Sequence, residues 1–158
     1  MHPQRDDERV AGATARLGLR SSGLATDFDI ARLEKCAGAT LPTLFATFLR
    51  RFNGCANVDL TFERDCVLFD PIARIIDNIE VYEIVGMGSI PFAHDFFGGL
   101  WFLALRPDAT GAPPGRIEFM AVQDRYIDPE NPIEQRSPTF QAFLEGLVRS
   151  DRSPTVAR

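Results

Sequence analysis

Cysteine is scarce and unpatterned in this sequence, and no apolar run is long enough to cross a membrane. The three cysteines are odd in number and form no C-x-x-C spacing, which argues against a disulfide framework or a zinc knuckle and fits a reducing compartment. A membrane-spanning helix needs about 20 apolar residues, and residues 1–23 lack the apolar segment of a secretory signal. We therefore expect a cytoplasmic protein that does not associate with membranes.

Lysine is almost absent, and the basic residues do not cluster. Lys35 is the only lysine among 17 basic residues, and Arg50 and Arg51 are the one adjacent basic pair. The net charge of −5 would repel nucleic acid and anionic lipid, so we expect neither as a partner. The same charge would attract a basic protein, although mild acidity is also an ordinary way of keeping a protein soluble.

Phenylalanine is abundant, with 13 copies in 158 residues. These side chains are rigid and apolar and need no hydrogen-bond partner when buried. A chain of this length can form one domain that buries a sizeable core. We expect such a core, with no requirement for a metal or a cofactor.

The first third of the chain predicts two core helices. Residues 1–25 show weak periodicity, and we interpret them as a flexible N-terminal arm or an accessory helix outside the core. Asp27 is a candidate N-cap for a helix whose apolar stripe includes Phe28 and Leu33 and which ends at Gly38. A second, more clearly amphipathic helix follows, with Pro42 in its first turn and its end at Asn53 and Gly54.

The remainder predicts mainly strands. Residues 58–63 alternate between apolar and acidic or polar side chains, as in a half-buried strand. Further strands are expected at 67–69, 90–93, 100–105 and 117–122, while the isoleucine-rich segment after Asp70 and Pro71 fits either a helix or a strand. Ser137 and Pro138 fit the start of a closing helix that carries Phe140, Phe143, Leu144 and Leu147.

This order of elements predicts an α+β fold with an antiparallel twisted sheet and helices packed on one face, in the order α-α-β(β)-(α)-β-β-β-α. Residues 26–149 would form the single domain, and residues 150–158 a frayed tail.

No catalytic or metal site emerges from the residues. His94 is the one histidine that could serve as a base, with Asp95 beside it, but neighbouring residues on a strand point to opposite faces. We therefore favour a structural or surface role for His94 and predict that the protein is not an enzyme. Carboxylates such as Asp59, Glu63 and Asp65 could hold a metal, but an exposed acidic face explains them better.

Several residues occur together in the order of one known family. The segment from Glu34 to Gly54 resembles the pattern E-x-x-x-G-x-x-L-P-x-x-(aromatic)-x-x-F-L-x-x-x-N-G of the SUKH superfamily, the Smi and Knr type proteins. A later segment, beginning at Ile90, is similar to that family's I-P-F-A-x-D-x-x-G pattern. The matched structural residues are Glu34, Leu41, Pro42, Phe48, Leu49, Asn53, Gly54, Pro91, Gly98 and Gly99.

The resemblance implies a binding scaffold without established catalytic residues, which in bacteria often serves as an immunity protein bound to a secreted toxin, frequently a nuclease. The arginine-rich, lysine-poor composition favours a bacterial source. We expect an acidic surface that docks on a basic toxin. The predicted contacts are Asp59, Glu63, Asp65 and Asp95, with Phe96 and Phe97 as exposed anchors.

Three alternatives remain open from the sequence, and one of them is an enzyme centred on His94 and Asp95. Phe96 and Phe97 could instead pack in the core, where large apolar side chains usually lie. The protein could also be a regulatory or scaffold protein of cell-envelope assembly or signalling, with the N-terminal arm as an adaptable binding segment.

Overall fold

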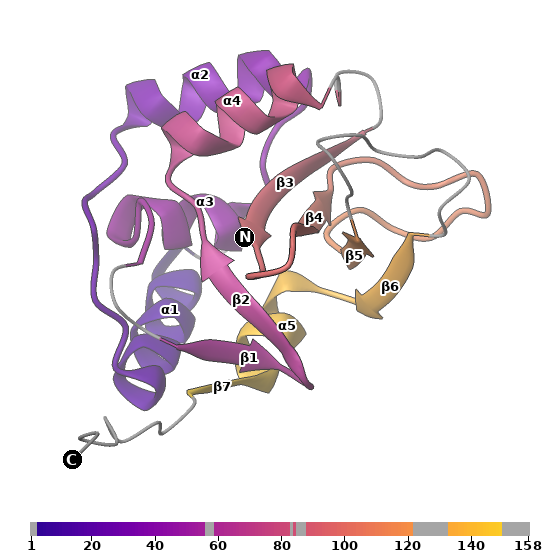
Figure 1. The fold of residues 1–158 in the computed structure, drawn as a ribbon. Helices are drawn as coiled ribbons and strands as arrows, with labels where there is room; N and C mark the ends of the chain where they lie inside the picture. The colour runs from indigo at the N-terminus through magenta and orange to yellow at the C-terminus, as the bar shows by residue number, and fades with distance from the viewer. Residues whose placement is uncertain (1–2, 56–58, 83, 85–87, 122–132, 150–158) are drawn as a thin grey trace.

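The computed structural model describes residues 3–55, 59–82, 84, 88–121 and 133–149. This part of the chain forms five helices and seven strands (Figure 1), which confirms the predicted α+β class. Along the chain the elements are α1 (Pro3–Leu17), α2 (Asp27–Ala37), α3 (Thr43–Arg51), β1 (Leu60–Phe62), β2 (Asp65–Phe69), α4 (Ile72–Val81), β3 (Ser89–His94), β4 (Gly99–Ala104), β5 (Ile117–Ala121), β6 (Glu134–Ser137), α5 (Phe140–Gly146) and β7 (Leu147–Arg149).

The strands form one antiparallel sheet in the order β6-β5-β4-β3-β2-β1-β7. The sheet is strongly curled: Arg136 of β6 contacts Asp65 of β2 although three strands lie between them, with 2.7 Å between Nη1 and Oδ2. Strand β2 pairs with β3 only at Leu68 and Phe69. The β1–β2 hairpin therefore leaves β3 at its outer end, and the sheet splits there.

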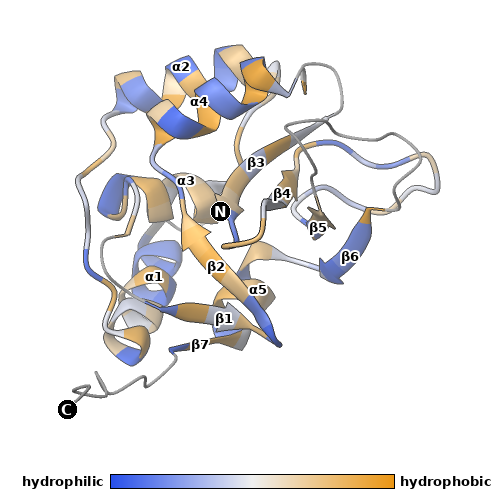
Figure 2. Cartoon of the chain, in the orientation of Figure 1, coloured by the Kyte–Doolittle hydropathy of each residue, from blue (hydrophilic) through white to orange (hydrophobic). Residues whose placement is uncertain are grey.

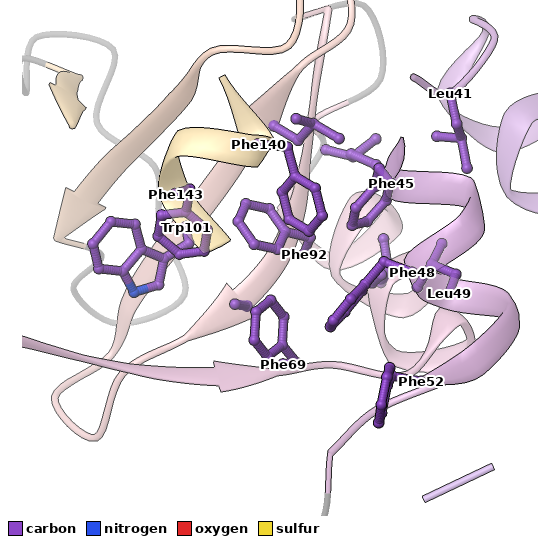
Figure 3. Close-up of a cluster of buried hydrophobic side chains, with 14 of the residues drawn as sticks. Leu41, Phe45, Phe48, Leu49, Phe52, Phe69, Phe92, Trp101, Phe140 and Phe143 are labelled. Atoms are coloured by element: carbon purple, nitrogen blue, oxygen red, sulfur yellow. The ribbon is translucent and has the colours of Figure 1, made fainter. Parts of the chain in front are cut away.

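A core of aromatic side chains lies between the sheet and helices α3 and α5 (Figure 3). Phe45 from α3 and Phe92 from β3 meet edge to face with 5.7 Å between ring centroids. Phe143 from α5 is fully buried and contacts five other aromatic rings, those of Phe62, Phe69, Phe92, Trp101 and Phe140. Such edge-to-face and tilted pairs stabilise a core beyond the area that they bury.

The N-cap of helix α2 lies one residue before the predicted one, because Asp27 is the first residue of the helix. Thr26 is the N-cap, and it forms a capping box with Asp29. Phe28 was predicted to lie on the buried stripe, but its side chain is 74% exposed. The prediction was wrong because position 28 lies on nearly the opposite side of the helix from the face that buries Ile30 and Leu33.

The N-terminal segment, interpreted as a flexible arm or an accessory helix outside the core, is the 15-residue helix α1. It packs along α3, and Val10 and Leu17 belong to the main core. Arg16 also donates hydrogen bonds to the backbone carbonyls of Leu144, in the last turn of α5, and of Leu147, which directly follows that helix. The placement of this segment outside the core was therefore wrong. Its sequence signal is weak, because Val10 and Leu17 are the only large apolar side chains of α1.

Helix α4 resolves the ambiguous segment after Asp70. Its four isoleucines are all buried, so the helical interpretation is the correct one. The apolar sides of the helices turn towards the sheet in Figure 2. A smaller cluster on the other side of the sheet joins Leu100 and Phe102 with Met120 and Ile84. Strand β4 is therefore buried on both faces, as its continuous apolar run allows.

Two short strands were missing from the sequence-based prediction. Strand β6 pairs with β5, and β7 pairs with β1. The closing helix starts after Thr139, whose side chain accepts from the Ala142 amide, and not at Ser137, which ends β6.

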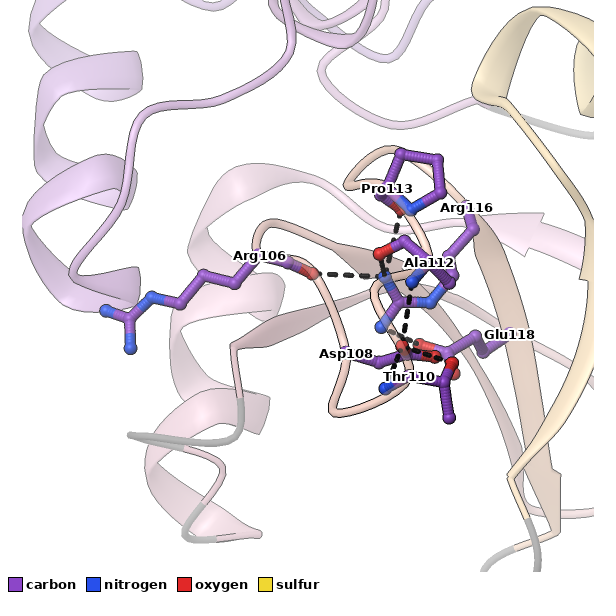
Figure 4. A network of polar contacts seen from close by, with 7 residues as sticks. All are labelled: Arg106, Asp108, Thr110, Ala112, Pro113, Arg116 and Glu118. Atoms are coloured by element: carbon purple, nitrogen blue, oxygen red, sulfur yellow. Dashed lines mark hydrogen bonds and ion pairs between the residues drawn. The ribbon is translucent and has the colours of Figure 1, made fainter.

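The loop between β4 and β5 is held from within (Figure 4). The buried Arg116 guanidinium donates to the carbonyls of Arg106, Ala112 and Pro113. It also lies 3.8 Å from a carboxylate oxygen of Glu118. Because one side chain satisfies three loop carbonyls, this loop has a defined shape without regular secondary structure.

None of the helices in the described ranges combines the length and apolar character that a membrane crossing needs. Val58, Val122 and the predicted tail at 150–158 lie outside the described residues.

Candidate acidic docking groove

A hollow of about 410 Å³ lies where the β1–β2 hairpin separates from β3. The hairpin forms one side, and the turn between β3 and β4 forms the other. Five of the six predicted contact residues line it, namely Asp59, Asp65, Asp95, Phe96 and Phe97; the other lining residues are Leu60, Thr61, Arg64 and Cys66. We call this hollow the acidic groove. The structure thus brings together residues more than 30 positions apart in the sequence.

The β3–β4 turn presents its two phenylalanines to solvent. The Phe96 side chain is 67% exposed and that of Phe97 91% exposed, so the core alternative is wrong. Asp95 holds the turn, because its Oδ1 accepts hydrogen bonds from the amides of Phe97 (2.8 Å) and Gly99 (2.6 Å). Gly98 adopts a φ of 87°, which favours glycine. The exposed pair therefore sits on a preformed support.

The part of β2 that does not pair with β3 is held by a hydrogen bond from a side chain. From Asp65 to Val67, no strand in the described part of the chain pairs with β2 on its β3 side. There the indole Nε1 of Trp101, on β4, donates to the Cys66 carbonyl at 3.0 Å. This bond satisfies a carbonyl that would otherwise lose its ladder partner, and it sets how far the hairpin opens.

The negative charge of the groove affects the ionisation of the Cys66 thiol. Burial, with the charges of Asp59 and Asp95, raises the pKa of the Cys66 thiol. Arg64 also lines the groove and offsets part of this charge. The acidity predicted for this surface is therefore centred on Asp59 and Asp95.

Glu63 and Asp65 contact Arg136 and are not free acidic contacts as the sequence suggested. Nη1 of Arg136 donates to Asp65 at 2.7 Å, and Nη2 donates to Glu63 at 3.2 Å. The Arg136 guanidinium also lies over Trp101, with 5.1 Å from Cζ to the ring centroid. Although burial opposes its charge, Asp65, Glu63 and Glu134 raise the pKa of Arg136 above its ordinary value.

Little in the sequence indicated a role for Arg136. It is one arginine among scattered others, and it lies at a register shift between β5 and β6. Such a bulge redirects a side chain, which explains how a residue on a polar strand turns inward with 6% of its side chain exposed.

His94 does not pair with Asp95. Its Nδ1 lies 2.8 Å from Oδ1 of Asp70, a buried carboxylate at the junction of β2 and α4. The partner of His94 is therefore Asp70, and not Asp95 as in the acid–base pair considered from the sequence. No group of three or more metal-binding side chains occurs within the described ranges.

The family-pattern residues hold the backbone around the two core helices. Glu34 accepts from the Leu41 amide at 2.9 Å and fixes the α2–α3 connection. Asn53 accepts from the Ile72 amide at 2.7 Å, at the start of α4. Gly54 has a φ of 90° and lies against Pro71. Pro42 precedes α3, and Leu41, Phe48 and Leu49 are buried.

In the central sheet, the family-pattern residues occupy irregular positions. Pro91 lies at a register shift between β3 and β4, where a residue without an amide proton is tolerated. Gly99 is required by close packing, since a side chain there would overlap the ring of Phe119.

We predict that Asp59→Asn makes Cys66 more reactive. Removing one of the charges that raise the thiol pKa increases the thiolate fraction at a given pH, and a few tenths of a pKa unit is worth about twofold in rate. Alkylation by iodoacetamide, followed by peptide mass spectrometry, measures this. Asp77→Asn, on the exposed side of α4, is the matched control, and Cys55, whose pKa burial raises to about 12, is an internal reference. An unchanged Cys66 rate would mean that Asp59 does not set the groove potential.

Most of the chain matches the model of one known protein family. Residues 24–146 match the family model described as SMI1 / KNR4 family (SUKH-1). A comparison with curated proteins finds no match.

Proposed function

The chain belongs to the SMI1/KNR4 family (SUKH-1), and from this premise we propose that it is a non-enzymatic immunity protein that neutralises a cognate toxin by direct binding. The toxin domain would be basic, of a class that includes nucleases, and the complex would form in the bacterial cytoplasm. The acidic groove and the Phe96–Phe97 turn would be the docking surface.

The observation that carries this proposal is the pairing of exposed aromatic anchors with carboxylates on one preformed turn. Phe97 is almost fully exposed, while Asp95 beneath it fixes the turn through two amide hydrogen bonds. Binding energy at protein interfaces is concentrated in a few such aromatic anchors. Surrounding charges of opposite sign speed the encounter. A preformed turn also loses little conformational entropy on binding.

The regulatory or scaffold alternative loses its structural support. It relied on residues 1–25 as an adaptable binding segment, but α1 packs on α3 and contributes to the core. Deleting residues 1–23 would therefore remove buried side chains and destabilise the domain. That deletion no longer separates the two functions. The neighbouring reading frame separates them, because the gene for an immunity protein is expected beside a gene that encodes a secreted protein with a C-terminal toxin domain.

Phe97→Ser and Asp59→Lys are expected to weaken toxin binding without loss of stability. Removing a central anchor typically costs about 2 kcal/mol or more, roughly 30-fold in Kd. Reversing a groove charge should slow association and reduce its salt dependence. The partner for this assay is the toxin domain encoded beside the gene. Binding is measured by biolayer interferometry, and protection by co-expression in cells.

Glu80→Lys, on the exposed side of α4, is the matched charge control. It should leave the affinity unchanged. Glu63 is left intact because a lysine there would lie beside Arg136. Normal affinity of both groove variants would place the docking surface elsewhere and overturn the assignment of the groove.

A further inference from the structure

A second hollow, of about 360 Å³, lies on the other side of the β3–β4 turn. Arg74, Asn78 and Tyr82 line it from α4 and its C-terminal end, and His94 and Asp95 line it from the end of β3. Asp95 also lines the acidic groove. The turn with the exposed phenylalanines therefore stands between two hollows, and the second one contains basic side chains facing solvent.

A buried carboxylate orients His94 in this hollow. The Asp70 side chain is only 2% exposed, and its Oδ2 has no hydrogen-bond partner among the described residues. Its Oδ1 lies 2.8 Å from His94 Nδ1 and 3.9 Å from an Arg74 guanidinium nitrogen. Burying such a charge is costly unless it is compensated. The imidazole Nδ1–H is its nearest donor, so Nε2 is left for a ligand.

We infer that this hollow binds a carboxylate side chain of the same protein partner, an inference that rests on the proposed function. The exposed Arg74 guanidinium supplies a permanent positive charge, and a protonated His94 donates through Nε2–H. Arg74 and an imidazolium at His94 carry two positive charges, and Asp70 compensates one of them, so the hollow suits a single carboxylate. A doubly charged phosphate would be repelled more strongly by Asp95, which also lines the hollow. The partner would thus present a basic residue to the groove and an acidic residue to this hollow.

Carboxylate binding here is coupled to proton uptake. A neutral imidazole whose Nδ1–H faces Asp70 offers only a lone pair at Nε2, which repels a carboxylate, whereas the imidazolium attracts it. Among the described residues, the charged or titratable groups around His94 are Asp70 at the β2–α4 junction, Arg74 of α4, Tyr82 directly after that helix, and Asp95 of the turn. Affinity for the carboxylate is therefore expected to increase as the pH falls.

Acetate is the probe, added to the full-length protein at constant ionic strength and followed by NMR of the histidine side chains. The chain has two histidines, so His2 is an internal reference. We expect a saturable shift of the His94 signals alone, with about threefold tighter binding at pH 6.0 than at pH 7.5. Arg74→Gln should weaken binding about tenfold, whereas Arg50→Gln, at a surface pair with Asp27, should not. Equal shifts of both histidines, or binding of inorganic phosphate but not acetate, would overturn the inference.

The second arm uses the complex. Arg74→Gln is expected to weaken binding of the toxin domain, and the loss should be larger at pH 6.0 than at pH 7.5. If acetate binds but Arg74→Gln leaves the toxin affinity unchanged at both pH values, the hollow does not serve the partner. Because the acetate titration needs no partner, its result stands even if the toxin assay shows that the proposed function is wrong.

Discussion

Replacing Arg136 with methionine is expected to lower the free energy of unfolding by about 3 kcal/mol, since removing one member of a buried ion pair leaves its partner uncompensated. The Arg136 guanidinium joins β6 to Asp65 and Glu63 across the curled sheet and covers Trp101 and Phe119. We place the value at the lower end of the usual range because Asp65 keeps a third of its side chain exposed. Chemical denaturation measures it.

Arg50→Met is the control for this substitution. Arg50 pairs with Asp27 on the surface, where ion pairs contribute little, and the change should stay within about 0.5 kcal/mol. Adding Asp65→Asn to Arg136→Met should recover about 1 kcal/mol relative to the sum of the single changes. If Arg136→Met were as mild as Arg50→Met, the contact across the sheet would not contribute to stability.

Phe143→Ala is expected to destabilise the domain by about 3–5 kcal/mol, the usual range for removing a fully buried aromatic side chain. Its ring has no exposed surface and contacts aromatic rings from β1 to β4 and α5. The cavity would lie at the centre of the core, where rigid rings cannot easily refill it. Urea unfolding followed by circular dichroism measures the loss.

Two matched variants separate packing from hydrophobicity at this position. Phe143→Leu keeps most of the apolar volume and should cost less than half as much. Phe97→Ala removes the same ring from a site that is 91% exposed, and its stability should change by about 0.5 kcal/mol or less. Equal effects of Phe143→Ala and Phe97→Ala would contradict the assignment of the core.

The elements that the sequence predicted correctly are those whose local pattern and tertiary environment agree. Helix α3 has apolar residues every three or four positions, and the sheet buries that face. Strand β6 is different, since Glu134–Ser137 has no apolar alternation and is a strand only because β5 lies beside it. Helix α1 was predicted to lie outside the core because it has only two large apolar side chains, Val10 and Leu17, although both are buried.

The groove could be predicted only in part, because its parts meet through the fold. Acidic residues around the β1–β2 hairpin and the two phenylalanines of the β3–β4 turn were singled out by type, and the structure brings most of them together. What could not be predicted was which carboxylates already have partners. Asp65 and Glu63 are held by Arg136, more than 70 residues away in the sequence. Pairings at that separation leave no local signal.

The pairing of β1 with β7 has a consequence for how the protein is made. Strand β1 lies between β2 and β7, so Leu60–Phe62 gain their second neighbour only from Leu147–Arg149. During synthesis the β1 edge stays open until almost the whole domain has left the ribosome. Open strand edges invite pairing with other chains, and contacts this distant in sequence form slowly. A chain released before residue 147 would therefore be a substrate for chaperones and proteases, even though most of its core residues had been synthesised.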